Sequence, residues 1–494
     1  MINLDLSGKK ANRICIVLLT LALTTSLPLL ANNISIDGTV TLTDQNNTED
    51  YTNIKFDISW ENSWRTNDLN GDGITNWDAA WVFAKWKLTS GSVWSYCTLN
   101  TSGHTAPSGS VVENPISDNP QTGVFIYRST DGTGSVDWDN AKLRWNYGTD
   151  LVADDATVDV KVFAIEMVYV PQGAFYAGDN ATSNASLKQG SSDSDPWYVN
   201  DSEAMVMNGV EFYYVSGGNS GEDVTGSSFT IPADFPNGFA AFYCMKYEIS
   251  QGQYADFLNT LTGTQDGNRY YSTTSYRYTI GGSAGSRIAS VPNNRACNYL
   301  SWADGAAYSD WAGLRPMTEL EFEKACRGTK AAVAGEYAWG STIVEATTIS
   351  GAENGTETVN GNCNYSWGSD FSGGDGGRGP LRCGIFAKSG TSRQDAGASY
   401  YGVMEMSGNL WERAVTLGNA TGRTFTGTHG NGELEGGGNA DIEYWPGTNA
   451  SGAGFRGGNW GNIATYLPVS YRRDAAYTSA ARNRYFGFRS ARTK

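Results

Sequence analysis

Histidine is nearly absent from this chain of 494 residues, which contains only His104 and His429. This shortage limits hydrolytic chemistry, because a Ser-His-Asp enzyme needs a histidine as its general base. Residues 281–285, GGSAG, have the spacing of a hydrolase nucleophile elbow, but no helix is predicted after them. The sequence therefore disfavours a hydrolase. Acidic residues are plentiful and no pair of them stands out, so a glycosidase stays open.

Positive charge is also scarce, with 35 Lys and Arg against 51 Asp and Glu and a net charge of −16. No block is rich in Lys or Arg. Binding to nucleic acid depends on neutralising phosphates, so we expect no nucleic-acid partner.

Long apolar runs are absent after residue 31. Before it, Lys9, Lys10 and Arg13 precede an apolar run over residues 14–30, and Ala31 is small enough for cleavage. This pattern predicts a signal peptide over residues 1–31 and a secreted, periplasmic or cell-surface protein. An uncleaved anchor is the alternative, although Pro28 makes the run a weak span. We expect no membrane span in the chain that remains.

Cysteine is sparse and absent after Cys383. Six cysteines remain once Cys15 of the signal peptide is set aside, and no two have the spacing of a metal knuckle. An even number in an exported chain predicts disulfides, and the sequence leaves their pairing open.

What the chain does contain is glycine, at 60 residues, and aromatic residues, at 12%. Residues 32–165 alternate apolar and polar positions between Gly, Asn, Asp and Ser turns, which predicts an all-β sandwich domain. Within it, Asp68, Asn70 and Asp72 alternate as in a calcium loop, but the twelfth position is Ala79. Calcium and a plain turn both remain possible there.

The sequence pattern changes at about residue 166, and residues 166–494 are predicted to form a second domain with a few short helices. Ser250 and Gln253 form a capping box ahead of one apolar stripe, Thr318 and Glu321 form another, and Ser301 is expected to cap a third helix. We interpret these helices as scaffold.

Five ordered blocks lie in this second region. They are residues 167–179 (MVYVPQGAFYAGD), 247–259 (YEISQGQYADFLN), 297–328, 401–412 (YGVMEMSGNLWE), and FRGGNW with GFR at 455–460 and 487–489. Together they resemble the formylglycine-generating enzyme (sulfatase-modifying factor) family over about residues 166–492. The resemblance implies an α+β, C-type-lectin-like fold, preceded here by the β-sandwich.

The same resemblance implies where catalysis would occur. Enzymes of that family hold copper on two cysteines placed shortly after the RGG block, and these positions correspond to Asn462 and Leu467. Soft thiolates are what select Cu(I), so we expect no copper and no formylglycine chemistry. Related iron enzymes need three histidines, which the chain does not have. An enzyme with altered chemistry is the alternative.

Calcium is the metal that the resemblance implies. The first site would use the side chains of Glu405 and Glu412 and the carbonyls of Gly408 and Leu410. The second would use Asn364, Tyr365, Asp375 and Gly377.

The last forty residues are rich in Tyr and Arg, the side chains that dominate protein interfaces. They resemble the variable proteins of diversity-generating retroelements, which implies a ligand-binding tail and an unknown protein or glycan partner. The candidate contacts are Trp460, Asn462, Tyr466, Tyr471, Asp474, Tyr477, Arg482, Arg484 and Tyr485. We expect the four tyrosines to be at least partly exposed on one face. The alternative is a structural surface protein in which the tail is packing.

Overall fold

The structure is a computed structural model that describes residues 33–115, 121–179, 185–192, 195–218, 221–290, 292–354, 356–367, 378–388 and 390–494. The predicted signal peptide lies outside these ranges and stays a prediction. Within them, no helix has the length and apolar character needed to cross a membrane.

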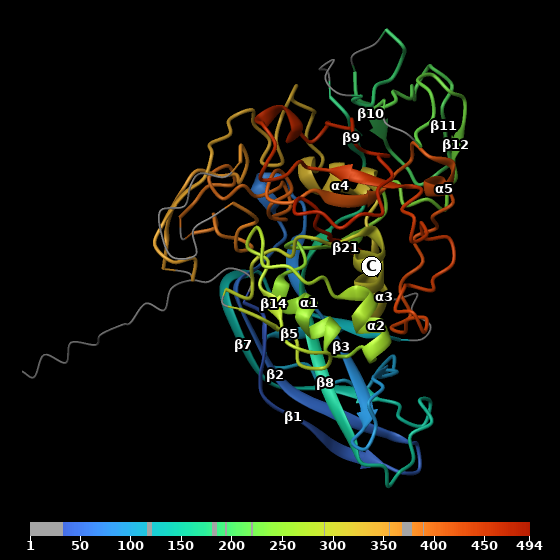
Figure 1. Ribbon diagram of the computed structural model, residues 1–494, viewed down its shortest axis with the longest axis vertical. Coiled ribbons are helices and arrows are strands. Elements are labelled where there is room, and N and C mark those ends of the chain that lie inside the picture. Colours follow the sequence, from blue (N-terminus) through green and yellow to red (C-terminus); the bar gives the residue numbers. More distant parts are fainter. Residues whose placement is uncertain are drawn as a thin grey trace, which may run out of the picture.

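An antiparallel sheet of eleven strands runs through the molecule, in a mixed α/β arrangement (Figure 1). Its central path is β1-β2-β3-β8-β13-β21-β16, with β7 paired to β2, and β4 and β6 paired to β3. The strands are β1 (Ser35–Asn46), β2 (Tyr51–Thr66), β3 (Asn76–Leu88), β4 (Ser95–Tyr96), β5 (Ser110–Glu113), β6 (Gly123–Arg128), β7 (Gly132–Trp145), β8 (Val158–Val170), β13 (Phe242–Met245), β16 (Arg315–Pro316) and β21 (Ser490–Thr493).

Strand β8 crosses the boundary predicted at residue 165. Along one edge it pairs with β3, from Val158 opposite Leu88 to Val168 opposite Asp78, and along the other it pairs with β13. The sheet therefore passes without a break from the N-terminal strands to the strand that ends the chain. The division into two domains stays a prediction, and the described part of residues 33–170 contains strands and no α-helix.

Two helices cover one face of this sheet and close a shared aromatic core. The ring of Trp311 on α3 (Trp302–Trp311) lies 5.0 Å from Phe83 of β3 and 4.9 Å from Phe163 of β8. Phe257 of α1 (Gln251–Leu258) packs against the same ring at 5.4 Å. Burying each such ring contributes about 1.5–3 kcal/mol. Side chains from both predicted domains thus hold the same core together.

The helices begin where the sequence predicts. Ser250, Ser301 and Thr318 each cap a helix, and each forms a reciprocal capping box, which confirms the three caps. A fourth box at Thr262 was not anticipated. The helices are α1 (Gln251–Leu258), α2 (Gly263–Arg269), α3 (Trp302–Trp311), α4 (Glu319–Arg327) and α5 (Ala420–Arg423), with 3-10 turns η1 (Leu69–Gly71) and η2 (Ala464–Tyr466).

Among the described residues of the second region, five two-stranded ribbons support the long loops. They are β9 (Phe175–Ala177) with β10 (Trp197–Val199), β11 (Met205–Val206) with β12 (Thr230–Ile231), β14 (Ile280–Gly281) with β15 (Ile288–Ala289), β17 (Thr348–Ser350) with β18 (Thr358–Asn360), and β19 (Glu412–Val415) with β20 (Ala453–Arg456). Between β20 and β21 the tail is irregular apart from η2.

The predicted disulfides are wrong. All six cysteines of the described chain, from Cys97 to Cys383, are buried thiols. Burial raises the pKa of Cys244 to about 12, so this thiol stays protonated. These cysteines act as small apolar side chains in the core, a role that an even count does not reveal.

The loop with calcium-like spacing is held as a turn. Lys330 Nζ lies 2.7 Å from one carboxylate oxygen of Asp72, and the hydroxyl of Tyr400 donates to the other. Asp68 accepts from the backbone N–H of Gly73 at 2.7 Å. An ammonium group therefore stands beside Asp72 where a calcium loop needs a cation, and the contacts favour the plain turn.

Candidate functional site

The start of the tail is anchored by a buried ion-pair network beneath β20. Arg456 lies 2.9 Å from Glu319 of α4, and Arg472 lies 2.7 Å from the same carboxylate. All three side chains are fully buried. Burial alone raises the pKa of Glu319, but the charges and hydrogen bonds of Arg472 and Arg456 outweigh it and hold the pKa below its ordinary value. The network thus stabilises the ionised form and fixes two points of the tail on one helix.

Two further arginines fix the distal part of the tail. Arg413 donates to the carbonyls of Ser479 and Ala481 at 2.9 and 3.0 Å, and its guanidinium lies over the ring of Phe455. Arg482 forms two hydrogen bonds, of 2.6 and 2.7 Å, to the buried carboxylate of Asp304. The backbone of this irregular segment is therefore held by charge-assisted bonds, although it has no ladder of its own.

The structure separates the predicted contact residues into buried and accessible ones. Trp460 is 0% exposed and Tyr471 is 2% exposed, so the expectation that all four tyrosines are partly exposed is wrong for Tyr471. Tyr471 packs against Trp411 and Phe455, and its hydroxyl bonds to Asp474. These two aromatic neighbours, Trp411 directly before β19 and Phe455 on β20, bury the ring of Tyr471.

The other three tyrosines lie around this buried group. Tyr477 is 41% exposed, and its ring is 6.1 Å from Phe455; Tyr466 and Tyr485 are half-buried against the same cluster. Trp367, 43% exposed, approaches Tyr485 at 6.2 Å. We call these four accessible rings, Trp367, Tyr466, Tyr477 and Tyr485, the aromatic surface. They lie over a fixed aromatic floor of Trp411, Phe455, Trp460 and Tyr471.

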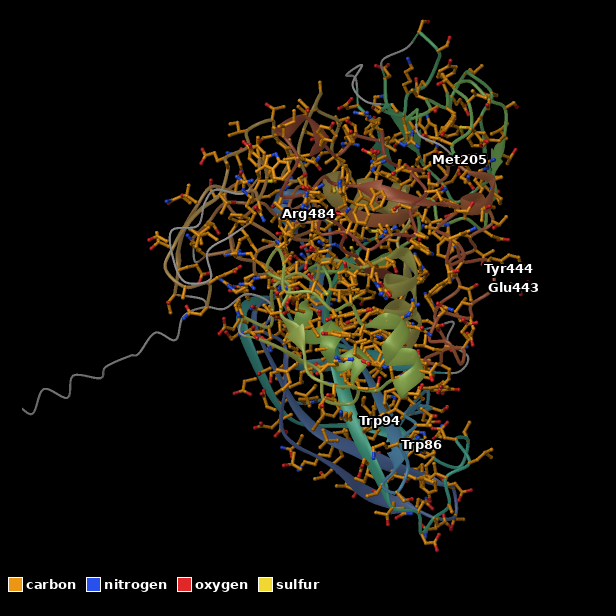
Figure 2. The ribbon with its side chains drawn as sticks, in the orientation of Figure 1. Trp86, Trp94, Met205, Glu443, Tyr444 and Arg484 are labelled. Atoms are coloured by element: carbon orange, nitrogen blue, oxygen red, sulfur yellow. The ribbon has the colours of Figure 1, made fainter. Side chains whose placement is uncertain are left out.

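The polar candidates adjoin this surface. The guanidinium of Arg484, which Figure 2 labels, contacts the rings of Tyr276 and Tyr485 at 4.4 and 4.7 Å from their centroids, so cation–π contacts hold it in place. Asn462 is half-buried and accepts hydrogen bonds from the backbone and side chain of Asn459. Arg484 is thus placed beside Tyr485, whereas Arg482 is engaged with Asp304.

Sequence reasoning missed Trp367, Tyr276 and Arg413. Trp367 and Tyr276 precede the tail by about a hundred residues or more, and both pack against Trp460 or Tyr485. Arg413 follows the last residue of the recognisable block YGVMEMSGNLWE directly, which is the one local signal that could have drawn attention to it.

A cluster of buried carboxylates coincides with the first expected calcium site. Glu405 accepts from the backbone N–H of Gly384 at 2.7 Å, and Glu412 lies 2.8 Å from Arg489. The second oxygen of each, Oε2, is buried and has no hydrogen-bond partner among the described residues. Burial raises the pKa of Glu405 to about 7, against the opposing charge of Arg489.

Glu248 is a third carboxylate of this cluster that the sequence did not reveal. It accepts from Asn409 and from the backbone N–H of Leu410, and burial together with the charge of Glu412 raises its pKa. One arginine therefore faces three buried acids. The described residues contain no group of three or more His, Cys, Asp or Glu side chains placed to hold a metal ion, so calcium here would need backbone carbonyls as well as the two unpartnered oxygens.

The second expected calcium site is only partly described. Asn364 donates to Gly379 and Asn409, and its Oδ1 is buried without a hydrogen-bond partner in the ranges that the structure covers. Tyr365 is half-buried beside it. Asp375 and Gly377 lie outside the described residues, so this site stays a prediction.

The two positions that the family resemblance assigns to copper cysteines, Asn462 and Leu467, offer no thiolate. Leu467 is fully buried in the apolar cluster with Val469, and Asn462 is bonded to Asn459. Neither side chain can bind Cu(I) as a thiolate does.

Comparison with known proteins places the chain in a family. The profile of the FGE-sulfatase family, described as the sulfatase-modifying factor enzyme 1-like domain, matches residues 153–494. A formylglycine-generating enzyme from Thermomonospora curvata is 32% identical over 132 residues, which cover 26% of this chain and 35% of that protein. The chain therefore belongs to the sulfatase-modifying factor family, and it aligns with about a third of that relative's length.

Proposed function

We propose that this protein is a non-catalytic member of the family that binds a protein or glycan ligand through the aromatic surface. The supporting observation is the combination of four accessible rings with a fixed floor, beside the two positions where family resemblance implies copper cysteines and this chain has Asn462 and Leu467. Rigid aromatic side chains bind well because they lose few rotamers on contact.

The remaining parts of the proposal follow from the sequence. We propose a C-type-lectin-like arrangement for the family region, with export to the periplasm, the cell surface or the medium. The tail would then be a diversified segment held between the RGGNW and GFR blocks. Its anchors, Arg456, Arg472 and Arg413, would leave the rings free to change while the backbone stays fixed.

Binding should depend on the three half-buried or exposed tyrosines. We expect a Tyr466→Ser, Tyr477→Ser, Tyr485→Ser variant to lose every ligand that the unchanged protein selects from a phage-displayed peptide library or a glycan array. Tyr477→Ser alone should change the free energy of unfolding by no more than about 0.5 kcal/mol, as at exposed sites. Denaturant unfolding checks the fold and surface plasmon resonance checks binding.

Tyr471→Ser is the matched control. It removes a buried ring, so the free energy of unfolding should fall by about 3–5 kcal/mol. Equal stability of Tyr471→Ser and Tyr477→Ser would contradict the division into a buried aromatic floor and an accessible aromatic surface. If the triple variant still bound the same ligands, the proposed function would be wrong.

We also propose calcium at the cluster of Glu405 and Glu412, together with the carbonyls of Gly408 and Leu410. Calcium would stabilise the fold by about 2.7 kcal/mol at a hundredfold excess over its dissociation constant. We expect chelation to lower the melting temperature measured by calorimetry. In the presence of a chelator, the raised pKa of Glu405 should make the free energy of unfolding depend on pH. The stabilisation by the protonated carboxyl is fully present below its ordinary pKa of 4.5 and is lost as the pH rises through about 7.

Two variants make this test specific. Glu405→Gln with Glu412→Gln should abolish the calcium-dependent shift, because the charges that attract the ion are gone. Asp72→Asn, in the loop held by Lys330, should leave the shift unchanged. A melting temperature that does not change on chelation would mean that the protein binds no stabilising calcium. A calcium-dependent shift that is lost in Asp72→Asn would place the ion in the loop of Asp72 instead.

A further inference from the structure

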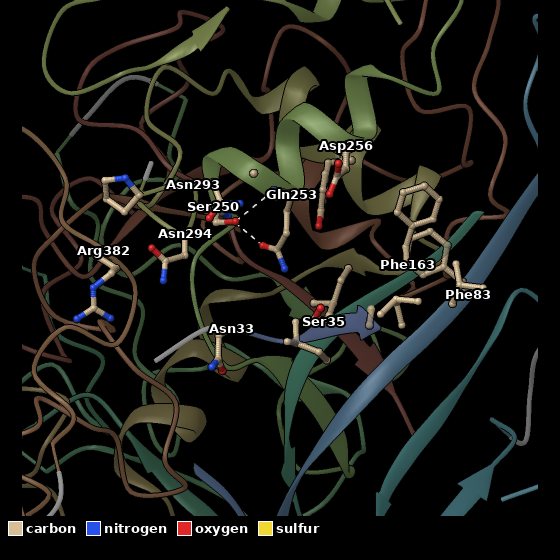
Figure 3. A pocket seen from close by; sticks show the side chains of 18 of the residues that line it. Asn33, Ser35, Phe83, Phe163, Ser250, Gln253, Asp256, Asn293, Asn294 and Arg382 are labelled. Atoms are coloured by element: carbon tan, nitrogen blue, oxygen red, sulfur yellow. Dashed lines mark hydrogen bonds between the residues drawn. The ribbon is translucent and has the colours of Figure 1, made fainter. Parts of the chain in front are cut away.

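A cavity of about 530 Å³ lies between α1, the start of β1 and strand β8, and the core residues Phe83 and Trp311 form part of its wall (Figure 3). Its volume falls in the range of about 300–1,000 Å³ that is usual for small-molecule sites. None of the predicted tail residues lines it. It is therefore independent of the aromatic surface.

Side-chain amides dominate the polar lining. Asn33, Gln253, Asn293 and Asn294 all border the cavity. The carbonyl oxygen of Gln253 accepts the capping bond from Ser250 at 3.0 Å, which leaves its amide nitrogen pointing into the open space (Figure 3). Amides offer donors and acceptors together, as do the hydroxyl groups of a neutral ligand.

Arg382 borders the same cavity. One guanidinium nitrogen pairs with Glu357 at 2.5 Å, whereas Nε and Nη1 are buried and lack a hydrogen-bond partner in the described part of the chain. These two nitrogens have almost no accessible surface, so a ligand in the cavity would meet only the part of Arg382 that borders the open space.

The two ends of the cavity differ in polarity. Figure 3 shows Arg382 at one end and the rings of Phe83 and Phe163 at the other, with Asp256 above them. Glu357 neutralises Arg382, and Asp256 contributes one negative charge opposed by Lys161. Neither an anion nor a cation is favoured by this arrangement.

We propose that the cavity binds a short neutral oligosaccharide. Its hydroxyl groups would bond to the amides, and the apolar face of one sugar ring would lie against Phe163. The dual donor and acceptor character of the lining suits hydroxyls better than carboxylates or amines, which each need one kind of partner.

Calorimetric titration of the protein with maltotriose, cellotriose and mannotriose tests this, with trigalacturonate as the anionic counterpart. We expect at least one neutral trisaccharide to bind, and Gln253→Glu to weaken that binding at least tenfold. The substitution keeps an oxygen that caps α1, removes the amide donor and adds one negative charge in the first turn of the helix, where the helix dipole favours it, so the melting temperature should hold.

Three results would overturn the inference: no binding by any neutral trisaccharide, tighter binding of trigalacturonate, or full affinity in Gln253→Glu. Tyr477→Ser is the control and should bind the trisaccharide within twofold of the unchanged protein. Loss of binding in Tyr477→Ser would assign the sugar to the aromatic surface instead. Hydrogen exchange over residues 250–258 gives a second readout, since a bound sugar should slow exchange there.

Discussion

Replacing Glu319 by alanine should lower the free energy of unfolding by about 3–5 kcal/mol, because it leaves Arg456 and Arg472 buried without their shared carboxylate. Glu319 also accepts from Thr416 and from the backbone N–H of Leu417, so its removal frees two further donors. The stabilisation by its ionised form is present above its ordinary pKa and is lost as the pH falls through the lower value of the folded state. Urea unfolding at two pH values measures both effects.

Arg473→Ala is the matched control for this network. Arg473 follows Arg472 directly but is exposed, so its loss should change stability by no more than about 0.5 kcal/mol. A loss below about 1 kcal/mol in Glu319→Ala, or equal losses in the two variants, would show that the tail is not anchored through α4.

Local features of this chain were predictable. A capping box needs only residues three apart, so Ser250, Ser301 and Thr318 could be read directly from the sequence, and all three cap helices. The family blocks likewise located Glu405 and Glu412, whose carboxylates do share one buried cluster with Arg489.

Features that depend on residues far away in the sequence could not be predicted. Tyr471 and Tyr477 have the same side chain six residues apart, yet Tyr471 is buried in the cluster with Trp411 and Phe455, whereas Tyr477 contacts Phe455 and stays 41% exposed. The continuity of the sheet through β8 depends on β13, more than seventy residues away in sequence. Glu248 could not be assigned to the carboxylate cluster either, because its partners Asn409 and Leu410 lie more than 160 residues further along the chain.

The central claim is that this member of the family binds without catalysing the family's reaction. Its most direct test is to incubate the protein, with Cu(I) and oxygen, with a peptide that carries the sulfatase cysteine motif, and to follow the peptide by mass spectrometry. The Thermomonospora curvata enzyme serves as the positive control. We expect the peptide cysteine to remain unchanged, because Asn462 and Leu467 supply no thiolates. Copper-dependent conversion of that cysteine to formylglycine would contradict the account.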